Sequence, residues 1–232
     1  IDDLIFHPDA EHLMPFLRRT SPADLREYRR QFKAHQKTLA ASDVCIASTP
    51  TIARHARDQG KPAITHPNLL PPHYLQLGKV IAPLRPALMR TPLIGYMSGS
   101  RTHDGDIALV APALRILLDR HPDPSLLFCG PLHVPPSLYD LMDRIIRFPY
   151  QDHRVYPWLM ARCRVVVAPL EVANDFAHGK SALKVFEAGI FGIPVVASPT
   201  GPYRDAIVEG VTGAIASNTQ EWVDAIEGFL DA

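Results

Sequence analysis

The residues best suited to chemistry lie in the stretch 178–198. Lys180, Lys184 and Glu187 are three or four residues apart, and the apolar residues between them predict a helix that carries these polar groups on one face. Both lysines then fall in the first turns of the helix, where the positive end of the macrodipole disfavours cations. A bound anion would remove that penalty, so the stretch predicts a phosphate site.

This helix and the strand after it belong to a longer alternation of helices and strands, which is typical of a parallel α/β sheet. Apolar runs that predict strands occur at residues 4–6, 44–47, 63–65, 93–97, 125–129, 144–148, 164–168 and 193–197. Residues 69–92 interrupt the rhythm with five prolines, as an interdomain linker would. We therefore predict an α/β part at 1–70, a linker at 71–92 and a doubly wound, Rossmann-like parallel sheet at 93–232.

A doubly wound sheet binds ligands at the carboxyl ends of its strands, and the loop after the strand at 93–97 lies there. It contains Gly99, Ser100 and Arg101. Small residues let backbone N–H groups approach an anion, and arginine can hold a phosphate with two hydrogen bonds. The spacing is neither that of a dinucleotide-binding motif nor that of a P-loop. An ordinary turn with a surface arginine is therefore an equal alternative.

Four further residues complete the predicted site. Glu187 is suited to accept hydrogen bonds from a ribose diol, although an ion pair with Lys184 is the alternative. Gly201 indicates a tight turn facing the same crevice, with Tyr203 in the same loop. His178 precedes the predicted helix, where a hydrogen-bonding surface role is commoner than catalysis.

The composition excludes several classes of partner and cofactor. With 24 basic and 24 acidic residues, no global charge favours nucleic acid. No apolar run is long enough to span a bilayer. The three cysteines lie in predicted strands, which favours buried thiols in a reducing, cytoplasmic compartment. Asp104 and Asp106 lie beside His103, and nothing else with ligand spacing accompanies them, so we expect no metal. Because the chain opens on Ile1, we expect a piece of something longer.

From residue 93 onward the sequence resembles the nucleotide-binding domain of GT-B glycosyltransferases of the group 1, or GT4-like, kind. The N-terminal part is similar to the end of that family's acceptor-side domain, through the segments IDDLIF, SDVCIAST and ITHPN. The resemblance implies two facing Rossmann-like domains, with a sugar nucleotide held mainly by the C-terminal one. The segments that carry it there are IGYMSGSRTHDGD, LLFCGP, VVVAPL, KSALKVFEAGIFGIPVVASPTGPY and IVEGVTGAIASNTQEW.

The resemblance also implies roles for single residues. Glu187 matches the second glutamate of the family's Glu-x7-Glu motif, which holds the donor ribose. Gly99 and Arg101 match the family's Gly-Arg after the first strand of this domain, where the arginine contacts the diphosphate.

Two positions depart from the family pattern. Gly179 stands where the first glutamate of the motif belongs, and Asp104 stands where the family has a phosphate-binding lysine. We expect Lys180 and Lys184 to replace the lost positive charge, and either His178 or Asp175 to reach the sugar.

The resemblance implies a retaining hexosyltransferase that uses a nucleoside-diphosphate-sugar and a glycan or lipid-linked acceptor, as in surface polysaccharide biosynthesis. Arg101, Lys180 and Lys184 would stabilise the leaving diphosphate without a metal or other cofactor. Peripheral membrane association of the longer protein stays open, and we expect the fragment alone to turn over poorly. The alternatives are a sugar-nucleotide epimerase or phosphorylase of the same fold, or a non-catalytic nucleotide-sugar-binding module.

Overall fold

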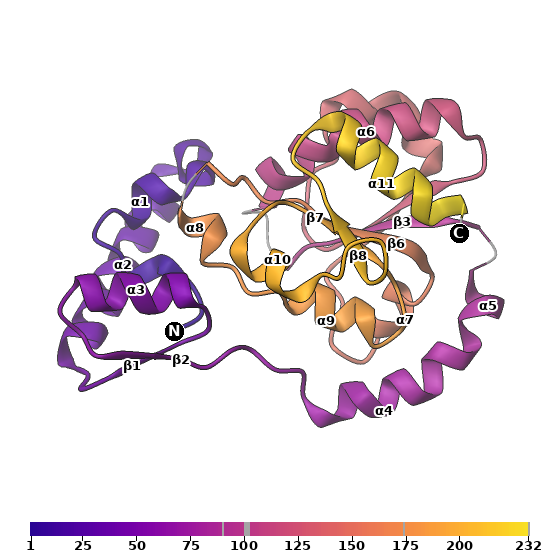
Figure 1. Ribbon diagram of the computed structural model, residues 1–232. Coiled ribbons are helices and arrows are strands. Elements are labelled where there is room, and N and C mark those ends of the chain that lie inside the picture. Colours follow the sequence, from indigo (N-terminus) through magenta and orange to yellow (C-terminus); the bar gives the residue numbers. More distant parts are fainter. Residues whose placement is uncertain (90, 100–102, 174, 232) are drawn as a thin grey trace. The chain divides into compact units, whose positions relative to one another are not determined.

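The computed structural model describes residues 1–89, 91–99, 103–173 and 175–231 (Figure 1). The chain divides into two compact units. Unit 1 comprises Ile1–Leu69 and Val172–Ala182, and unit 2 comprises Leu70–Glu171 and Leu183–Ala232. This division differs from the predicted boundaries in two places. The predicted linker belongs to unit 2, and a segment from the middle of the C-terminal part belongs to unit 1.

Unit 2 is built on a parallel six-stranded sheet in the order β5-β4-β3-β6-β7-β8. The chain forms β3, β4 and β5 outward in one direction and then β6, β7 and β8 outward in the other, which is the doubly wound arrangement. The predicted fold class is therefore confirmed. The strands are β3 (Leu93–Met97), β4 (Ser125–Cys129), β5 (Ile145–Phe148), β6 (Cys163–Ala168), β7 (Val195–Ala197) and β8 (Gly213–Ile215).

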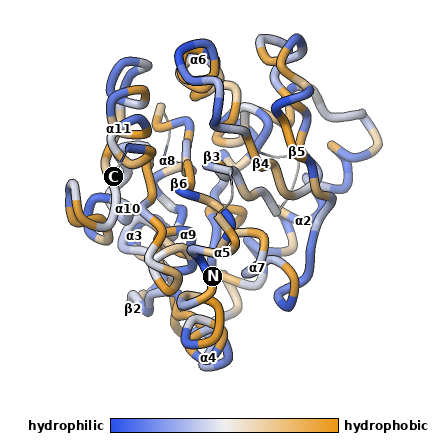
Figure 2. Tube along the Cα trace, turned by 90° about the vertical axis from the view of Figure 1, so that its right-hand side faces the viewer, coloured by the Kyte–Doolittle hydropathy of each residue, from blue (hydrophilic) through white to orange (hydrophobic). Residues whose placement is uncertain are grey.

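The central strands are largely apolar because helices cover both faces of the sheet. All five residues of β3 are buried, as is usual for a strand of a parallel sheet. On one face, α6 (Asp104–Arg120) and α11 (Thr219–Asp231) contribute Leu114 and Val223 to a core with Ile94 and Val165. Hydrophobic and hydrophilic residues alternate along α11, as expected of a helix that covers a sheet with one side (Figure 2).

The predicted linker is helical. It forms α4 (Pro72–Ile81), a 3-10 turn (Ala82–Leu84) and α5 (Arg85–Leu88). Gly78 packs so closely on Ile190 that a side chain at Gly78 would overlap it. Arg85 donates hydrogen bonds to the carbonyl oxygens of Phe191 (2.8 Å), Gly192 (2.9 Å) and Cys163 (3.0 Å). Several prolines of the predicted linker occupy first helical turns, where proline initiates a helix. The segment is therefore not irregular, and its role as an interdomain linker stays a prediction.

The remaining helices of unit 2 are short and connect strand ends. They are the 3-10 helix Pro136–Arg144, α7 (Tyr156–Met160), α9 (Leu183–Gly189) and α10 (Gly201–Ala206). The helix α9 crosses from β6 to β7, so its first turn begins on the side of the sheet where β6 ends. None of the described helices is both long and apolar enough to cross a membrane.

Unit 1 holds a two-stranded parallel sheet of β1 (Cys45–Ala47) and β2 (Ala63–Thr65). Its helices are α1 (Ala10–Leu13), α2 (Pro22–Ala41), α3 (Pro50–Asp58) and the 3-10 helix Pro15–Arg19. The strand predicted at residues 4–6 is wrong, because Leu4–Phe6 is a 3-10 turn closed by a hydrogen bond from the His7 N–H to the Leu4 carbonyl oxygen (3.0 Å). A run of three apolar residues does not distinguish the two.

Residues 172–182, called here the crossing segment, leave the sheet after β6 and pack on unit 1. Within it, α8 (Asp175–His178) places Phe176 against the apolar core of unit 1. Three polar contacts hold the residues that follow α8. They are Thr49 Oγ1 to the Gly179 carbonyl oxygen (3.2 Å), Lys180 Nζ to Asp3 Oδ1 (2.7 Å) and Asn68 Nδ2 to Ser181 Oγ (3.1 Å).

Candidate functional site

The strand order of unit 2 reverses between β3 and β6, and the crevice beyond the carboxyl ends of these two strands is the usual ligand site. The loop after β3 packs tightly on the loop after β4. Ser98 N–H donates to the Cys129 carbonyl oxygen (2.8 Å). Gly130 has φ +118°, and a Cβ there would overlap the Ser98 carbonyl oxygen. Only glycine therefore fits this position without strain.

Asp106, in the first turn of α6, joins the loops after β3 and β6. Its Oδ2 atom is 2.8 Å from His103 Nδ1, and its Oδ1 atom accepts from the Glu171 N–H (3.0 Å). The Tyr96 hydroxyl donates to the His103 carbonyl oxygen (3.2 Å). Asp106 is only 12% exposed and His103 only 18%. The crevice between β3 and β6 is thus bordered by a fixed histidine–aspartate pair.

Asp104 is engaged in a second pair of the same kind. Its carboxylate accepts from the His133 N–H (2.9 Å) and lies 2.7 Å from His133 Nδ1, which ties α6 to the loop after β4. Each of the two aspartates thus anchors a loop, and among the described residues there is no cluster of three potential metal ligands. The expectation that the reaction needs no metal stays a prediction.

Glu187 lies on α9 and accepts a hydrogen bond from the Tyr156 hydroxyl (2.9 Å). Burial raises the pKa of Glu187, against the opposing effects of that hydrogen bond and of Lys184. Burial, with a contribution from Glu187, raises the pKa of Tyr74 to about 12. The pKa of Tyr203 is likewise raised by burial and then by Asp106 and Glu187. A partly buried carboxylate therefore lies among neutral tyrosine hydroxyls, and none of the described residues donates to its second oxygen.

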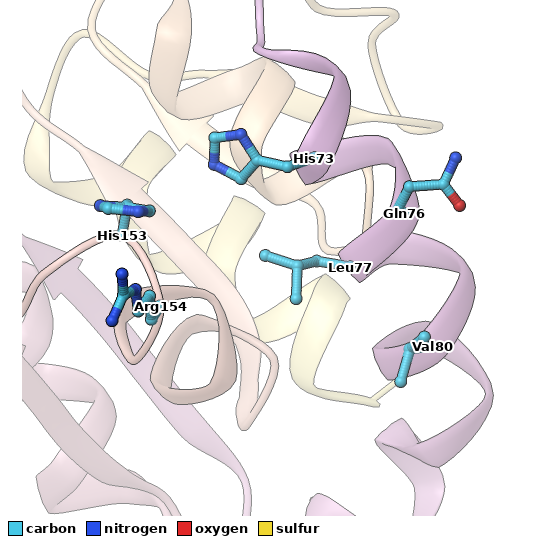
Figure 3. A pocket seen from close by; sticks show the side chains of 6 residues that line it. All are labelled: His73, Gln76, Leu77, Val80, His153 and Arg154. Carbon is cyan, nitrogen blue, oxygen red and sulfur yellow. The ribbon is translucent and has the colours of Figure 1, made fainter.

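A cavity of about 470 Å³ opens beside this region, between α4 and the loop before α7. In Figure 3, His73 and Leu77 point from α4 towards His153 and Arg154. The ring centroids of His73 and His153 are 5.5 Å apart. Sequence reasoning did not single out these residues, because exposed histidines carry no motif.

The comparison with known protein families shows the family to which this chain belongs. A model described as glycosyl transferases group 1 matches residues 91–232, which is more than half of the chain and contains the whole sheet of unit 2. The chain belongs to the group 1 glycosyl transferases. No curated protein matches it. The resemblance stated from the sequence is therefore confirmed at the level of the family.

Solved structures of glycosyltransferases share the GT-B fold of this chain. HepE from Anabaena in complex with UDP-glucose matches at 18% identity and TM-score 0.59, over 93% of this chain and 60% of that one. A TarM mutant from S. aureus, in complex with fondaparinux, alpha-GlcNAc-glycerol and UDP, matches at 15% identity and TM-score 0.64. The match covers 88% of this chain and 40% of TarM. WaaG, a glycosyltransferase involved in lipopolysaccharide biosynthesis, matches at 14% identity and TM-score 0.63, over 93% of this chain and 60% of WaaG. The chain thus spans about 60% of HepE.

The structure separates the residues predicted for the donor site of this glycosyl transferase. Lys184 and Glu187 lie on α9, and Gly201 and Tyr203 lie on α10, all in unit 2. Gly99 is in the loop after β3. His178 and Lys180 lie in unit 1, where Lys180 pairs with Asp3. Ser100 and Arg101 lie outside the described residues, so their predicted contact with the diphosphate stays a prediction.

The helix predicted to carry both lysines begins later than expected. It starts at Leu183, so Lys180 precedes it and Lys184 lies in its first turn. The reason is tertiary. The hydrogen bonds of Gly179, Lys180 and Ser181 to unit 1 hold these residues outside the helix. The spacing of polar residues within 178–198 could not predict these partners, because Asp3, Thr49 and Asn68 are more than 100 residues away in the sequence.

Five residues near the site were not assigned to catalysis or to ligand binding by the sequence analysis. Tyr74 and Tyr156 contribute to the surroundings of Glu187 from helices that are distant in the sequence. The pairing of His103 with Asp106 has a signal, since residues three apart in a first helical turn are neighbours. Thr200 is fully buried, and its hydroxyl has no hydrogen-bond partner within the described residues. Nothing in the local sequence points to Thr200.

Proposed function

We propose that the protein binds a nucleoside-diphosphate-sugar at the crevice of unit 2 and transfers its sugar to a glycan or lipid-linked acceptor. The observation that carries the proposal is the Glu187 carboxylate. It is partly buried, held on one oxygen by Tyr156, and has no described donor on the other. A ribose diol offers two hydroxyl donors for such a group. Family membership over residues 91–232 supports sugar transfer as the reaction.

The cations beside the crevice suit the leaving group of this reaction. When the glycosidic bond to the donor breaks, negative charge grows on the diphosphate, and fixed cations stabilise it. Lys184, in the first turn of α9, and Arg101, after β3, are the residues that we assign to this role. Gly99, in the loop after β3, and Gly201 and Tyr203, on α10, are the residues that we place around the donor. Retention of configuration and a hexosyl donor are implied by the family resemblance.

The similar solved structures indicate which donors and acceptors to test first. HepE was solved with UDP-glucose, the TarM mutant with UDP and alpha-GlcNAc-glycerol, and WaaG is described by its part in lipopolysaccharide biosynthesis. We infer a UDP-sugar donor and a surface polysaccharide or glycolipid acceptor for the longer protein, working in the cytoplasm without a metal. We further propose that the longer protein associates peripherally with the membrane that carries a lipid-linked acceptor.

Calorimetric titration with UDP-, GDP- and dTDP-sugars tests the donor site. We expect the sugars of one of these three nucleotides to bind. Glu187→Ala should weaken the affinity for that donor at least fivefold, because the ribose loses hydrogen bonds to a charged acceptor. Glu227→Ala is the matched control, since Glu227, on α11, pairs with His121 at the end of α6. The absence of binding by every donor at millimolar concentration refutes the proposal.

Product analysis with the longer protein then identifies the reaction. Transfer needs an acceptor, whereas an epimerase converts the donor alone and a phosphorylase requires free phosphate. If Glu187→Ala and Lys184→Ala both leave transfer unchanged, the unit is a non-catalytic binding module.

A further inference from the structure

We propose that α4, together with the cavity beside it, is a surface that binds a bilayer of anionic lipids. The apolar side chains that α4 exposes enter the outer part of the bilayer, and the cavity holds the phosphate of one lipid headgroup. The inference rests on the proposed function, since it names the surface by which the longer protein approaches a membrane-borne acceptor. All of its residues belong to unit 2, at 72–84 and 153–154.

The helix α4 carries apolar side chains on two sides. Tyr74 and Ile81 are buried and face the interior of unit 2. Leu75 and Val80 lie on the outer side, where they remain 55% and 57% exposed, and Leu84 is exposed in the turn that follows. A helix that only covers a domain has a polar outer side. The outer side of α4 is therefore suited to a second apolar environment.

The charge of this part of the chain fits an anionic partner. No aspartate or glutamate occurs from Gln59 to His103, although the whole chain has as many acidic as basic residues. Within this stretch Lys79 is exposed on α4, and among the described residues no ion pair or hydrogen bond engages its amine. Cations beside exposed apolar side chains are typical of helices that lie in the interface of an anionic bilayer.

The cavity beside α4 provides hydrogen-bond donors for a phosphate group. Its volume is about 470 Å³, and its lining includes His73 on α4 and both His153 and Arg154 in the loop before α7 (Figure 3). The two imidazole rings have centroids 5.5 Å apart. Within the described part of the chain, none of these three side chains has a hydrogen-bond or salt-bridge partner. Arginine can hold a phosphate with two hydrogen bonds, and each imidazole can donate one N–H.

The carboxylate that is adjacent in the sequence does not neutralise this cavity. Asp152 Oδ1 accepts from the backbone N–H of Arg154 (2.7 Å), and that hydrogen bond is the main cause that lowers the pKa of Asp152. The carboxylate therefore shapes the loop before α7. None of the described residues that line the cavity is acidic.

The basic side of α2 in unit 1 is the other candidate for contact with an anionic surface. Arg26, Arg30, Lys33 and Lys37 follow one another at helical spacing there. Arg30, however, pairs with Glu27 on the same helix (2.8 Å). All residues of α2 are described, and none of its large hydrophobic side chains is exposed. A helix without exposed apolar side chains gains no burial from a bilayer, so α4 is the favoured surface.

Binding of the full chain to vesicles tests the inference. Vesicles of phosphatidylcholine alone are compared, by flotation at low salt, with vesicles of equal parts of phosphatidylcholine and phosphatidylglycerol. We expect the chain to bind the anionic vesicles and not the neutral ones. Val80→Asp should weaken this binding roughly tenfold or more, because a carboxylate disfavours entry into the apolar part of the bilayer, and Arg154→Gln about fivefold, because one cation is lost. Lys33→Gln, on α2, is the matched control and should bind as the wild type does.

Three results of the flotation experiment overturn the inference. They are a wild type that does not bind the anionic vesicles or binds both kinds equally, unchanged binding of Val80→Asp and Arg154→Gln, and an equal loss of binding in Lys33→Gln. Soluble glycerol phosphate is titrated as well. If it binds as tightly as the vesicles do and Val80→Asp leaves that affinity unchanged, the cavity takes a free phosphate and the inference falls.

The donor titration is independent of this surface. Val80→Asp should keep the nucleotide affinity of the wild type, so a failure of donor binding counts against the proposed function alone. Should Val80→Asp not fold, amide exchange of the wild type replaces it. Exchange in α4 must slow on anionic vesicles more than exchange in α2, and equal changes in the two helices overturn the inference.

Discussion

The substitution Glu187→Gln is expected to separate stability from nucleotide binding. Burial raises the pKa of Glu187 in the folded state, even though Tyr156 and Lys184 act in the opposite direction. A carboxyl group with a raised pKa stabilises the fold fully below its unfolded value of about 4.3 and loses that contribution as the pH rises through its folded value. At pH 8 the ionised side chain is therefore unfavourable to folding, and glutamine removes this effect.

The size of the change follows from the contacts of the side chain. The glutamine oxygen can still accept from the Tyr156 hydroxyl, which lies 2.9 Å from the carboxylate. Replacing a charged acceptor by a neutral one loses about 1 kcal/mol of that hydrogen bond, and relief from burying a charge offsets this loss. We expect the variant to be as stable as the wild type at pH 8, or more stable by about 1 kcal/mol. Nucleotide affinity should fall about 5- to 30-fold, since the ribose also loses a charged acceptor.

Urea unfolding followed by tryptophan fluorescence measures the first effect, because Trp158 and Trp222 both lie in unit 2. The difference between variant and wild type should disappear at pH 4, where the carboxyl group is largely protonated. Calorimetry with the best nucleotide measures the second effect. A variant that is less stable by more than about 1 kcal/mol at pH 8, but equal at pH 4, would show that the carboxylate stabilises the fold. Unchanged affinity would remove Glu187 from the donor site.

Three other substitutions test the supports of the site. Gly130→Ala should lower the free energy of unfolding by about 3 kcal/mol, since its Cβ overlaps the Ser98 carbonyl oxygen at a positive φ; an unchanged urea midpoint contradicts this packing. Arg85→Met should lower it by about 2 kcal/mol, because three carbonyl oxygens, two of them in partly buried hydrogen bonds, lose a charged donor; a loss under about 1 kcal/mol would show that other contacts hold α5 in place. Lys180→Ala removes a partly exposed pair with Asp3, so about 1 kcal/mol or less is expected, with faster amide exchange in the crossing segment; equal exchange rates argue against that anchor.

The alternation of apolar runs and helical patterns was sufficient to predict the sheet of unit 2. The buried strands β3, β4 and β6 are nearly continuous apolar segments, because helices cover both faces of a doubly wound sheet. Such burial imposes a local pattern that can be read residue by residue. Where the pattern is short or contains proline, it failed. The sequence predicted a strand at Leu4–Phe6, which is a 3-10 turn, and it did not predict the helices α4 and α5 within the proline-containing segment.

The sequence by itself determined the fold class, the family and the position of Glu187 on a crossover helix. Only the tertiary structure showed that Lys180 is held by Asp3 in unit 1, and that Glu187 lies among tyrosines from other helices. It also showed that Asp106 contacts His103 and the backbone of Glu171, and so joins the loops after β3 and β6. The physical reason is the distance along the sequence over which each feature is determined. Strand and helix patterns follow from burial along a few residues, whereas ion pairs and oriented rings depend on residues that folding brings together from distant positions.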